Sequence, residues 1–245
     1  EPFMGTGVVG FNVAPSKALM CDSNPHLIRF YQHLKSEKIT PARVRAFLEK
    51  EGALLLERGE RHYYDVRTRF NTEHDPLDFL FVNRAAFNGM IRFNKKGEMN
   101  IPFCRKPNRY AKAYVTKIVN QVAAVSKIIR EKEFVFMCQS FEDSLAMADT
   151  QSFVYCDPPY IGRHVDYYNG WNEQRELKLF ELLSATKASF LLSTWHHNDF
   201  RKNTYIDQLW GRFNVQQRSH FYHVGGREQN RNPMVEALVS NMRLD

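Results

Sequence analysis

The tetrapeptide Asp157-Pro158-Pro159-Tyr160, which follows the apolar stretch FVYC, carries the clearest chemical signal in the sequence. Two prolines stiffen the backbone, and proline donates no hydrogen bond, so the nearby carbonyl groups remain available as acceptors. The adjacent carboxylate and aromatic ring can hold a planar base with an exocyclic amino group by its edge and its face. This set suits adenine. The alternative is a structural turn that Asp157 caps, with Tyr160 packed in the core.

Such a site can activate an amino group that is otherwise a weak nucleophile. The Asp157 carboxylate and the Pro158 carbonyl can draw the amino hydrogens of adenine out of the ring plane, which restores lone-pair density for attack on an electrophilic methyl group. The proton can leave after the methyl group is transferred, so a general base is not required before that step. The proximity of the two reactants supplies much of the remaining rate enhancement. An adenine in a duplex must be flipped out to reach this site, and Tyr160 is its natural stacking platform.

The opening EPFMGTG predicts a ligand-binding turn. Glycines at positions 5 and 7, just after Phe3, let a ligand approach the backbone ahead of a helix, whose N-terminus favours a carboxylate or phosphate. Asp22 follows the next predicted strand, where an acid in a nucleotide-binding α/β fold accepts hydrogen bonds from ribose hydroxyls. Together they indicate an adenosyl ligand. The alternatives are an ordinary Gly-rich turn, and Asp22 as the N-cap of a helix at Pro25.

The elements that must position these residues alternate along the chain. Apolar runs of four to seven residues separated by helical patterns predict βαβ units around a mostly parallel sheet. The expected strands are 18–21, 134–138, 153–156, 190–193, part of 213–224, and 235–239. The expected helices are 41–57, 109–129 and 173–185. The stretch GGREQNRNP between the last two strands predicts a C-terminal antiparallel hairpin.

Basic residues are concentrated in the middle third of the chain. The formal net charge is +7, and 17 Lys and Arg stand against 9 Asp and Glu between Lys38 and Lys117, so the rest is near neutral. This segregation favours a nucleic-acid surface over an ordinary solvated face. The region 75–107 mixes aromatic residues with the turn signals Asn88-Gly89 and Lys96-Gly97, which we interpret as an inserted module.

The composition excludes several classes of protein. With 245 residues, 43% of them hydrophobic and 25% charged, the chain is long enough for one large α/β domain or a core domain with one insertion, not a disordered or collagen-like chain. No run approaches eighteen apolar residues, so we expect a soluble cytoplasmic protein without a membrane partner. We also expect a monomer in solution. The four cysteines form no C-x-x-C pair, so we expect reduced thiols. His196 and His197 are adjacent, and adjacent histidines rarely bind one ion together, so we expect no metal site there.

The order of FMGTG, a basic insert and DPPY resembles the Dam-type, D12 class of adenine-specific DNA methyltransferases, over essentially the whole chain. The stretches EPFMGTGVV, FNGMIRFN, YCDPPYIGRHVDY, STWHHND and FYHVG are similar to the EcoRV-type modification enzymes of that class. The resemblance implies methyl transfer from S-adenosylmethionine, without a metal, to the 6-amino group of adenine in double-stranded DNA. It further implies a GATATC target, a bacterial restriction-modification system and association with the nucleoid.

The same resemblance implies a fold and a set of site residues. The fold is a class I S-adenosylmethionine-dependent methyltransferase with a Rossmann-like sheet, in catalytic parts 1–37 and 119–245, and an inserted, mainly helical target-recognition domain, 38–118. The catalytic residues are Asp157, Pro158 and Tyr160. The cofactor-binding residues are Phe3, Gly5, Gly7, Asp22, Ser140, Phe141 and Asp157. The DNA-binding residues are Asn88, Arg92, Asn94, Lys95, Lys96, Pro102, Arg105 and Lys106, with Arg92 bidentate to a guanine.

Three further expectations qualify this interpretation. Relatives carry a segment before EPF that helps close the cofactor site, whereas this sequence begins at Glu1, so we expect a piece of a longer protein with weak cofactor affinity. A catalytically impaired DNA-binding fragment is therefore one alternative, and a methyltransferase acting on RNA or a protein amide is another. Tyr167, Tyr168 and Trp171 are either a lid over the flipped base or ordinary packing.

Overall fold

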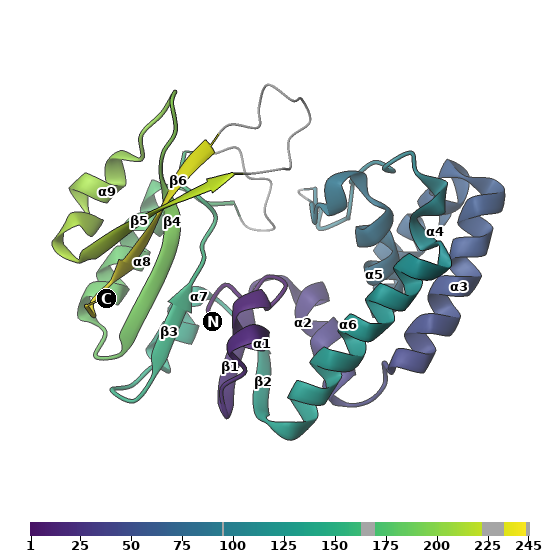
Figure 1. Ribbon diagram of the computed structural model, residues 1–245, viewed down its shortest axis with the longest axis horizontal. Coiled ribbons are helices and arrows are strands. Elements are labelled where there is room, and N and C mark those ends of the chain that lie inside the picture. The colour runs from purple at the N-terminus through teal and green to yellow at the C-terminus, as the bar shows by residue number, and fades with distance from the viewer. Residues whose placement is uncertain (95, 163–169, 222–232, 244–245) are drawn as a thin grey trace. The chain divides into compact units, whose positions relative to one another are not determined.

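The computed structural model describes residues 1–94, 96–162, 170–221 and 233–243, and the chain forms two compact units (Figure 1). Unit 1 consists of Glu1–Met4, Cys21–Ser23 and Gln139–Asp245. Unit 2 consists of Gly5–Met20 and Asn24–Cys138. Each unit therefore contains segments that are far apart in the sequence, and we describe each by itself.

Unit 1 is built on a four-stranded sheet with the order β3-β4-β6-β5. The strands are β3 (Phe153–Cys156), β4 (Ser189–His197), β5 (Asn214–Phe221) and β6 (Pro233–Ser240). The helices are α7 (Phe141–Ala146), α8 (Glu173–Ala185), α9 (Thr204–Gln208) and the 3₁₀ helix η3 (Trp210–Arg212). Strand β3 runs parallel to β4, whereas β6 runs antiparallel to both β4 and β5.

The pairing in unit 1 confirms the predicted C-terminal antiparallel hairpin, which β5 and β6 form. Three of the four strands of the sheet, β3, β4 and β5, point the same way and β6 is reversed, so the sheet is mixed in the way expected of a mostly parallel sheet that ends in such a hairpin. Eleven residues separate the end of β5 from the start of β6, whereas a crossover between parallel strands needs about a dozen or more, so this connection favours the antiparallel hairpin.

Helix α8 covers the sheet of unit 1 with its apolar face. The Asn172 side chain caps the helix by accepting a hydrogen bond from the backbone N–H of Arg175 at 3.0 Å. Leu179 and Leu183 are buried in the same cluster as Phe190 of β4. Burying each leucine contributes roughly 1.5–3 kcal/mol relative to exposure. The Asn172 cap and the apolar face with Leu179 and Leu183 explain why the observed helix has the same bounds as the predicted helix, 173–185.

Unit 2 is mainly helical. Its helices are α1 (Val8–Val13), α2 (Pro25–Lys35), α3 (Pro41–Arg58), α4 (Glu60–Glu73), α5 (Pro76–Ala85) and α6 (Lys112–Glu131), with the 3₁₀ helices η1 (Phe87–Gly89) and η2 (Pro107–Tyr110). Strands β1 (Lys17–Asp22) and β2 (Glu133–Cys138) form a two-stranded sheet, and β1 ends in unit 1. Among the described residues, no helix is both long and apolar enough to cross a membrane.

The helices of unit 2 confirm two predicted segments, whereas α2, α4 and α5 were not among the expected helices. Helices α3 and α6 match the expected helices 41–57 and 109–129, although η2 occupies the start of the second. Helix α5 lies within the region interpreted as turns and aromatic residues. Phe81 and Val82 on it are fully buried, and a helix that is apolar on most sides shows no single stripe. Its N-cap is Asp75, which accepts from the N–H of Leu77 at 2.7 Å.

Close packing in unit 2 requires a glycine on α3. The Tyr110 ring stacks on Phe81 with centroids 4.8 Å apart, and its hydroxyl donates to the Phe81 carbonyl at 2.5 Å. A Cβ atom at Gly52 would overlap the Cβ of Tyr110. Gly52 is thus the residue that lets α3 approach η2 this closely.

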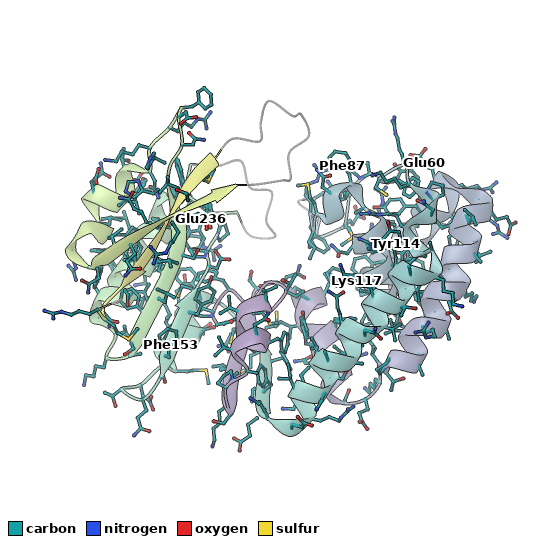
Figure 2. All side chains as sticks on the ribbon, in the orientation of Figure 1. Glu60, Phe87, Tyr114, Lys117, Phe153 and Glu236 are labelled. Atoms are coloured by element: carbon teal, nitrogen blue, oxygen red, sulfur yellow. The ribbon has the colours of Figure 1, made fainter. Side chains whose placement is uncertain are left out.

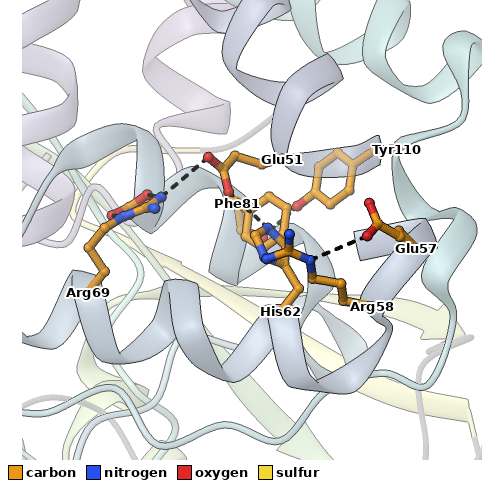
Figure 3. A network of polar contacts seen from close by, with 8 residues as sticks. Glu51, Glu57, Arg58, His62, Arg69, Phe81 and Tyr110 are labelled. Atoms are coloured by element: carbon orange, nitrogen blue, oxygen red, sulfur yellow. Dashed lines mark hydrogen bonds and ion pairs between the residues drawn. The ribbon is translucent and has the colours of Figure 1, made fainter. Parts of the chain in front are cut away.

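Buried polar side chains and the partly exposed Arg69 connect three helices of unit 2 (Figure 3). Glu51 of α3 lies 2.9 Å from His62 of α4, and Arg69 of α4 lies 3.6 Å from Glu51. Arg69 also donates two hydrogen bonds to Asp78 of α5, at 2.7 and 2.5 Å. Breaking a buried pair leaves an uncompensated charge, so these contacts fix the arrangement of the helices. Arg69, one of the basic residues of this region, therefore makes its ion pairs within the unit.

Candidate functional site

Backbone hydrogen bonds bring three distant segments of unit 1 together. The N–H of Met4 donates to the Cys21 carbonyl, and the N–H of Cys21 donates to the Glu1 carbonyl, both at 2.8 Å. The N–H of Gln139 donates to the Asp22 carbonyl at 3.2 Å. Four of the predicted cofactor-binding residues lie on these segments: Phe3, Asp22, Ser140 and Phe141. The opening segment, the end of β1 and the start of α7 thus form one cluster.

Aromatic rings fill the centre of this cluster. The rings of Phe3 and Phe141 stack at 5.3 Å, and Trp171 lies 5.6 Å from each of them. A base between Phe3 and Phe141 would need about 7 Å, twice the usual contact distance, so none fits between these two rings as they lie. The Trp171 indole donates to the buried Glu176 at 2.7 Å. Trp171 is thereby packed against this cluster, while Tyr167 and Tyr168 fall outside the described residues.

The remaining cofactor candidates have mainly backbone roles. The Ser140 hydroxyl is the N-cap of α7, since it accepts from the N–H of Asp143 at 3.0 Å and donates to the Asp143 carboxylate at 2.7 Å. Asp22 does not cap α2, because Asn24 does so. Gly5 and Gly7 both have left-handed φ values, 48° and 67°, and belong to unit 2, where Gly7 is the N-cap residue of α1. The predicted Gly-rich turn before a helix is confirmed.

Asp157 lies directly after β3 in unit 1, among other carboxylates. Desolvation by the surrounding protein, followed by the charges of Glu236 and Glu1, raises the pKa of Asp157 to about 6. Its side chain still has an exposed face, so solvent or a ligand can reach it, whereas Pro158 beside it is buried. An accessible carboxylate with a raised pKa is a better proton acceptor near neutral pH than an ordinary aspartate.

The segment that follows Asp157 is held by side chains of two neighbouring strands, β4 and β6. The Tyr160 hydroxyl donates to Glu236 of β6 at 3.2 Å. The buried Trp195 indole of β4 donates to the carbonyl of Ile161 at 2.8 Å. Trp195 and Glu236 are paired across β4 and β6, so neighbouring strands fix successive residues. Glu236 and Trp195 are site residues that sequence reasoning missed.

Two other groups in unit 1, a cysteine thiol and a pair of histidines, are of types that can do different chemistry. Cys156 is fully buried, and burial raises the pKa of its thiol to about 12, so it is a protonated core residue rather than a nucleophile. His196 and His197 contact each other through their Nδ1 atoms at 2.8 Å. In the part of the chain that the structure describes, no group of three or more His, Cys, Asp or Glu is arranged to hold a metal ion.

The predicted DNA-binding residues of unit 2 lie on one paired segment, residues 86–106, which we call the recognition loop. Bridges between Ala86 and Phe103 and between Phe93 and Met99 pair its two halves. Asn88, Lys96, Pro102, Arg105 and Lys106 are exposed on this loop, and Lys95 falls outside the described residues. Figure 2 shows Phe87, at the start of the loop, and Tyr114 and Lys117 of α6 on the same unit.

Hydrogen bonds inside the recognition loop orient its two central polar side chains. Arg92 donates from Nε to the side-chain oxygen of Asn100 at 2.9 Å and from a terminal nitrogen to its carbonyl at 3.3 Å. The Asn94 side-chain oxygen accepts from the N–H groups of Lys96 and Glu98, at 2.9 and 3.1 Å. Arg92 is therefore a positioned cation, and Asn94 stabilises the turn of the loop.

Comparison with known proteins decides the family. The model of the D12 class N6 adenine-specific DNA methyltransferases matches residues 1–224. The chain belongs to this family. It is 35% identical over 166 residues to the DNA adenine methylase of Vibrio cholerae, and 34% identical over 166 residues to that of Escherichia coli strain K12. Each of these matches covers 65% of this chain and 55% of the relative, so the chain spans about half the length of these relatives.

A more distant relative aligns along nearly the whole chain. The Type II methyltransferase M.FokI of Planomicrobium okeanokoites is 27% identical over 98% of this chain and 38% of its own length. The D12 family membership therefore extends over both units, including the recognition loop and the Asp157 segment.

Proposed function

We propose that this D12 family member transfers a methyl group from S-adenosylmethionine to the 6-amino group of an adenine flipped out of duplex DNA. The observation that carries the proposal is the accessible Asp157 carboxylate, with its raised pKa, beside the buried Pro158. The carboxylate and the Pro158 carbonyl accept the two amino hydrogens, and the Tyr160 ring stacks on the base. The nitrogen lone pair would form the new bond to the methyl carbon as the bond between that carbon and the sulfonium sulfur breaks, which leaves the cofactor as the neutral thioether S-adenosylhomocysteine. The proton that leaves the nitrogen would go to Asp157 or to solvent.

The cluster around Phe3 has the groups that an adenosyl cofactor needs. Phe3 is partly exposed and packs on the buried ring of Phe141, and the Asp22 carboxylate is half-buried at the end of β1. Asp22 would accept hydrogen bonds from the ribose hydroxyls. When bound, S-adenosylmethionine supplies the methyl group as an electrophile on its sulfonium sulfur. We assign Gly5 and Gly7 to the close approach of that cofactor to the backbone, within a class I, Rossmann-like catalytic domain.

We also propose that residues 38–118 are the target-recognition domain. All of them lie in unit 2, and the recognition loop contributes Arg92 as the guanine contact, with the exposed Lys96, Arg105 and Lys106 on phosphates. The target proposed from the resemblance is GATATC, as the modification half of a restriction-modification system. The Type II relative M.FokI is consistent with this role.

Labelled S-adenosylmethionine and matched duplexes test the proposed function. We expect label in adenine of a duplex that contains GATATC, and little in a duplex in which that site is scrambled. If the label appeared in RNA or in protein instead, that molecule and not DNA would be the substrate. Duplex binding without any label would make the chain a DNA-binding fragment.

The pH dependence of transfer tests the role of the carboxylates. Protonated Asp157 loses acceptor capacity, so transfer is expected to fall as pH decreases through about 6. Glu236→Gln removes one of the charges that raise the pKa of Asp157, so the acid limb of kcat/KM is expected to move to lower pH. The amide oxygen of the glutamine still accepts from Tyr160. An acid limb that stays in place in this variant would contradict the electrostatic role of Glu236.

The matched control for this substitution is Glu181→Gln. Glu181 is an exposed residue of α8 that pairs with Lys178 at 3.4 Å. The same charge is removed from the same unit, away from Asp157, so the pH profile should match that of the unmodified protein.

A further inference from the structure

A tight turn after β4, residues 198–202, carries an aromatic side chain into solvent. Phe200 is 75% exposed, more than any other large apolar side chain among the described residues. The Asn198 side chain accepts from the N–H groups of Phe200 and Arg201, at 3.0 and 2.8 Å. A single exposed ring is ordinary on a protein surface, so its position in the fold must decide whether it has a role.

The turn is fixed to the strand that supports the Asp157 segment. Asn203, which is 1% exposed, donates from its side chain to the Trp195 carbonyl at 2.9 Å, and its N–H donates to the His196 carbonyl at 2.8 Å. His197 and Lys202 form a bridge across the base of the turn. Since Trp195 also holds Ile161, Phe200 is presented from the same framework that holds the proposed catalytic residues.

Sheet geometry places Phe200 beyond the edge at which Asp157 lies. Strands β3 and β4 are parallel, so their carboxyl ends share one edge of the sheet, where α/β folds bind ligands. Cys156, the last residue of β3, is opposite Leu192, and β4 continues five residues further to His197. At the rise of an extended strand this is about 16 Å. A duplex whose flipped base lies at Asp157 would face the turn that projects past it.

The turn presents one cation that is not used in an ion pair with Asp207, next to the exposed ring. Lys202 is neutralised by Asp207, at 2.5 Å, and Asp199 is the acid within the turn. Arg201 is exposed next to Phe200. Aromatic rings stack on bases of any sequence, and arginine binds phosphate.

We propose that Phe200 and Arg201 form a contact of unit 1 with duplex DNA, in which Phe200 packs on bases next to the flipped adenine and Arg201 binds a phosphate. This inference rests on the proposed function, because it assumes that the flipped adenine lies at Asp157. It adds a DNA contact on the catalytic side, independent of the recognition loop.

The test is DNA binding by the unmodified protein and by Phe200→Ala, with a GATATC duplex that carries 2-aminopurine in place of either adenine. Fluorescence anisotropy gives affinity, and 2-aminopurine emission reports base flipping. We expect Phe200→Ala to bind about 5- to 100-fold more weakly and to lose most of the emission change, and Phe200→Trp to retain both. Arg201→Ala should make the slope of log K against log salt concentration less steep, by the amount expected for about one phosphate contact.

Phe153→Ala is the matched control. Phe153 (Figure 2) is 57% exposed and begins β3, at the opposite edge of the same sheet, so its loss should leave binding and emission unchanged. Affinity and emission within about twofold of the unmodified protein for Phe200→Ala would overturn the inference. A sedimentation coefficient of Phe200→Ala, without DNA, lower than that of the unmodified protein would also overturn the inference, because Phe200 would then be a contact between two copies of the chain. If the unmodified protein labels adenine and Phe200→Ala binds normally, only this inference fails; absence of label in adenine rejects the proposed function itself.

Discussion

Asp157→Ala is expected to lose methyl transfer by about 100-fold or more while keeping its affinity for duplex DNA. The carboxylate is proposed to act on the amino group of the flipped base alone, and the proposed specificity contacts belong to unit 2. Single-turnover transfer of labelled methyl groups measures the first effect, and anisotropy with a labelled duplex measures the second. Turnover equal to that of the unmodified protein would reject the mechanism.

Asp157→Asn separates the two contributions of the carboxylate. The amide keeps one oxygen that can accept an amino hydrogen, but it has no carboxyl group to titrate. We therefore expect slow residual transfer without the fall near pH 6 that is expected of the unmodified protein. Loss equal to that of Asp157→Ala would mean that the negative charge, rather than the acceptor geometry, is essential.

Arg92→Ala is expected to cost about 1–3 kcal/mol and to relax discrimination at one guanine position. Asn100 holds the Arg92 side chain by two hydrogen bonds, so the guanidinium is oriented before DNA arrives. Less ordering is then needed for bidentate contact with a base. Methylation of a series of duplexes, each with one base pair of the target exchanged, locates the position at which discrimination is lost.

Lys106→Ala is the control for this series. Lys106 is an exposed cation of the same loop, for which we expect a similar loss on every duplex and a smaller salt dependence of binding. If Arg92→Ala behaves in the same way, with equal losses on all sequences, Arg92 is a phosphate contact rather than a guanine contact.

The sequence predicts the parts of the fold in which local signals agree. Strand β3 and helix α8 match their predicted ranges because the strand is a short apolar run and the helix has both a cap at Asn172 and a stripe of leucines. Helix α5 has no such stripe because most of its sides are buried. The position of β6 between β4 and β5 was not predicted, since it depends on which strand lies next to which and not on composition.

The candidate site shows the same division. Asp157 and Tyr160 could be found because four adjacent residues combine their chemistry. Glu236 could not, because it reaches Tyr160 only through the pairing of β6 with β4. Ser140 was expected at the cofactor, yet its hydroxyl caps α7, a role that depends on Asp143 three residues later. Contacts made by the tertiary fold are absent from any local pattern.

The division of the chain into two compact units has a consequence for evolution. The residues proposed to read the DNA sequence belong to unit 2, whereas the acceptor residues around Asp157 belong to unit 1. Mutations that alter the preferred recognition sequence can accumulate in one unit without disturbing the reaction chemistry of the other. A lineage of such enzymes can therefore diversify its targets while inheriting the same reaction centre.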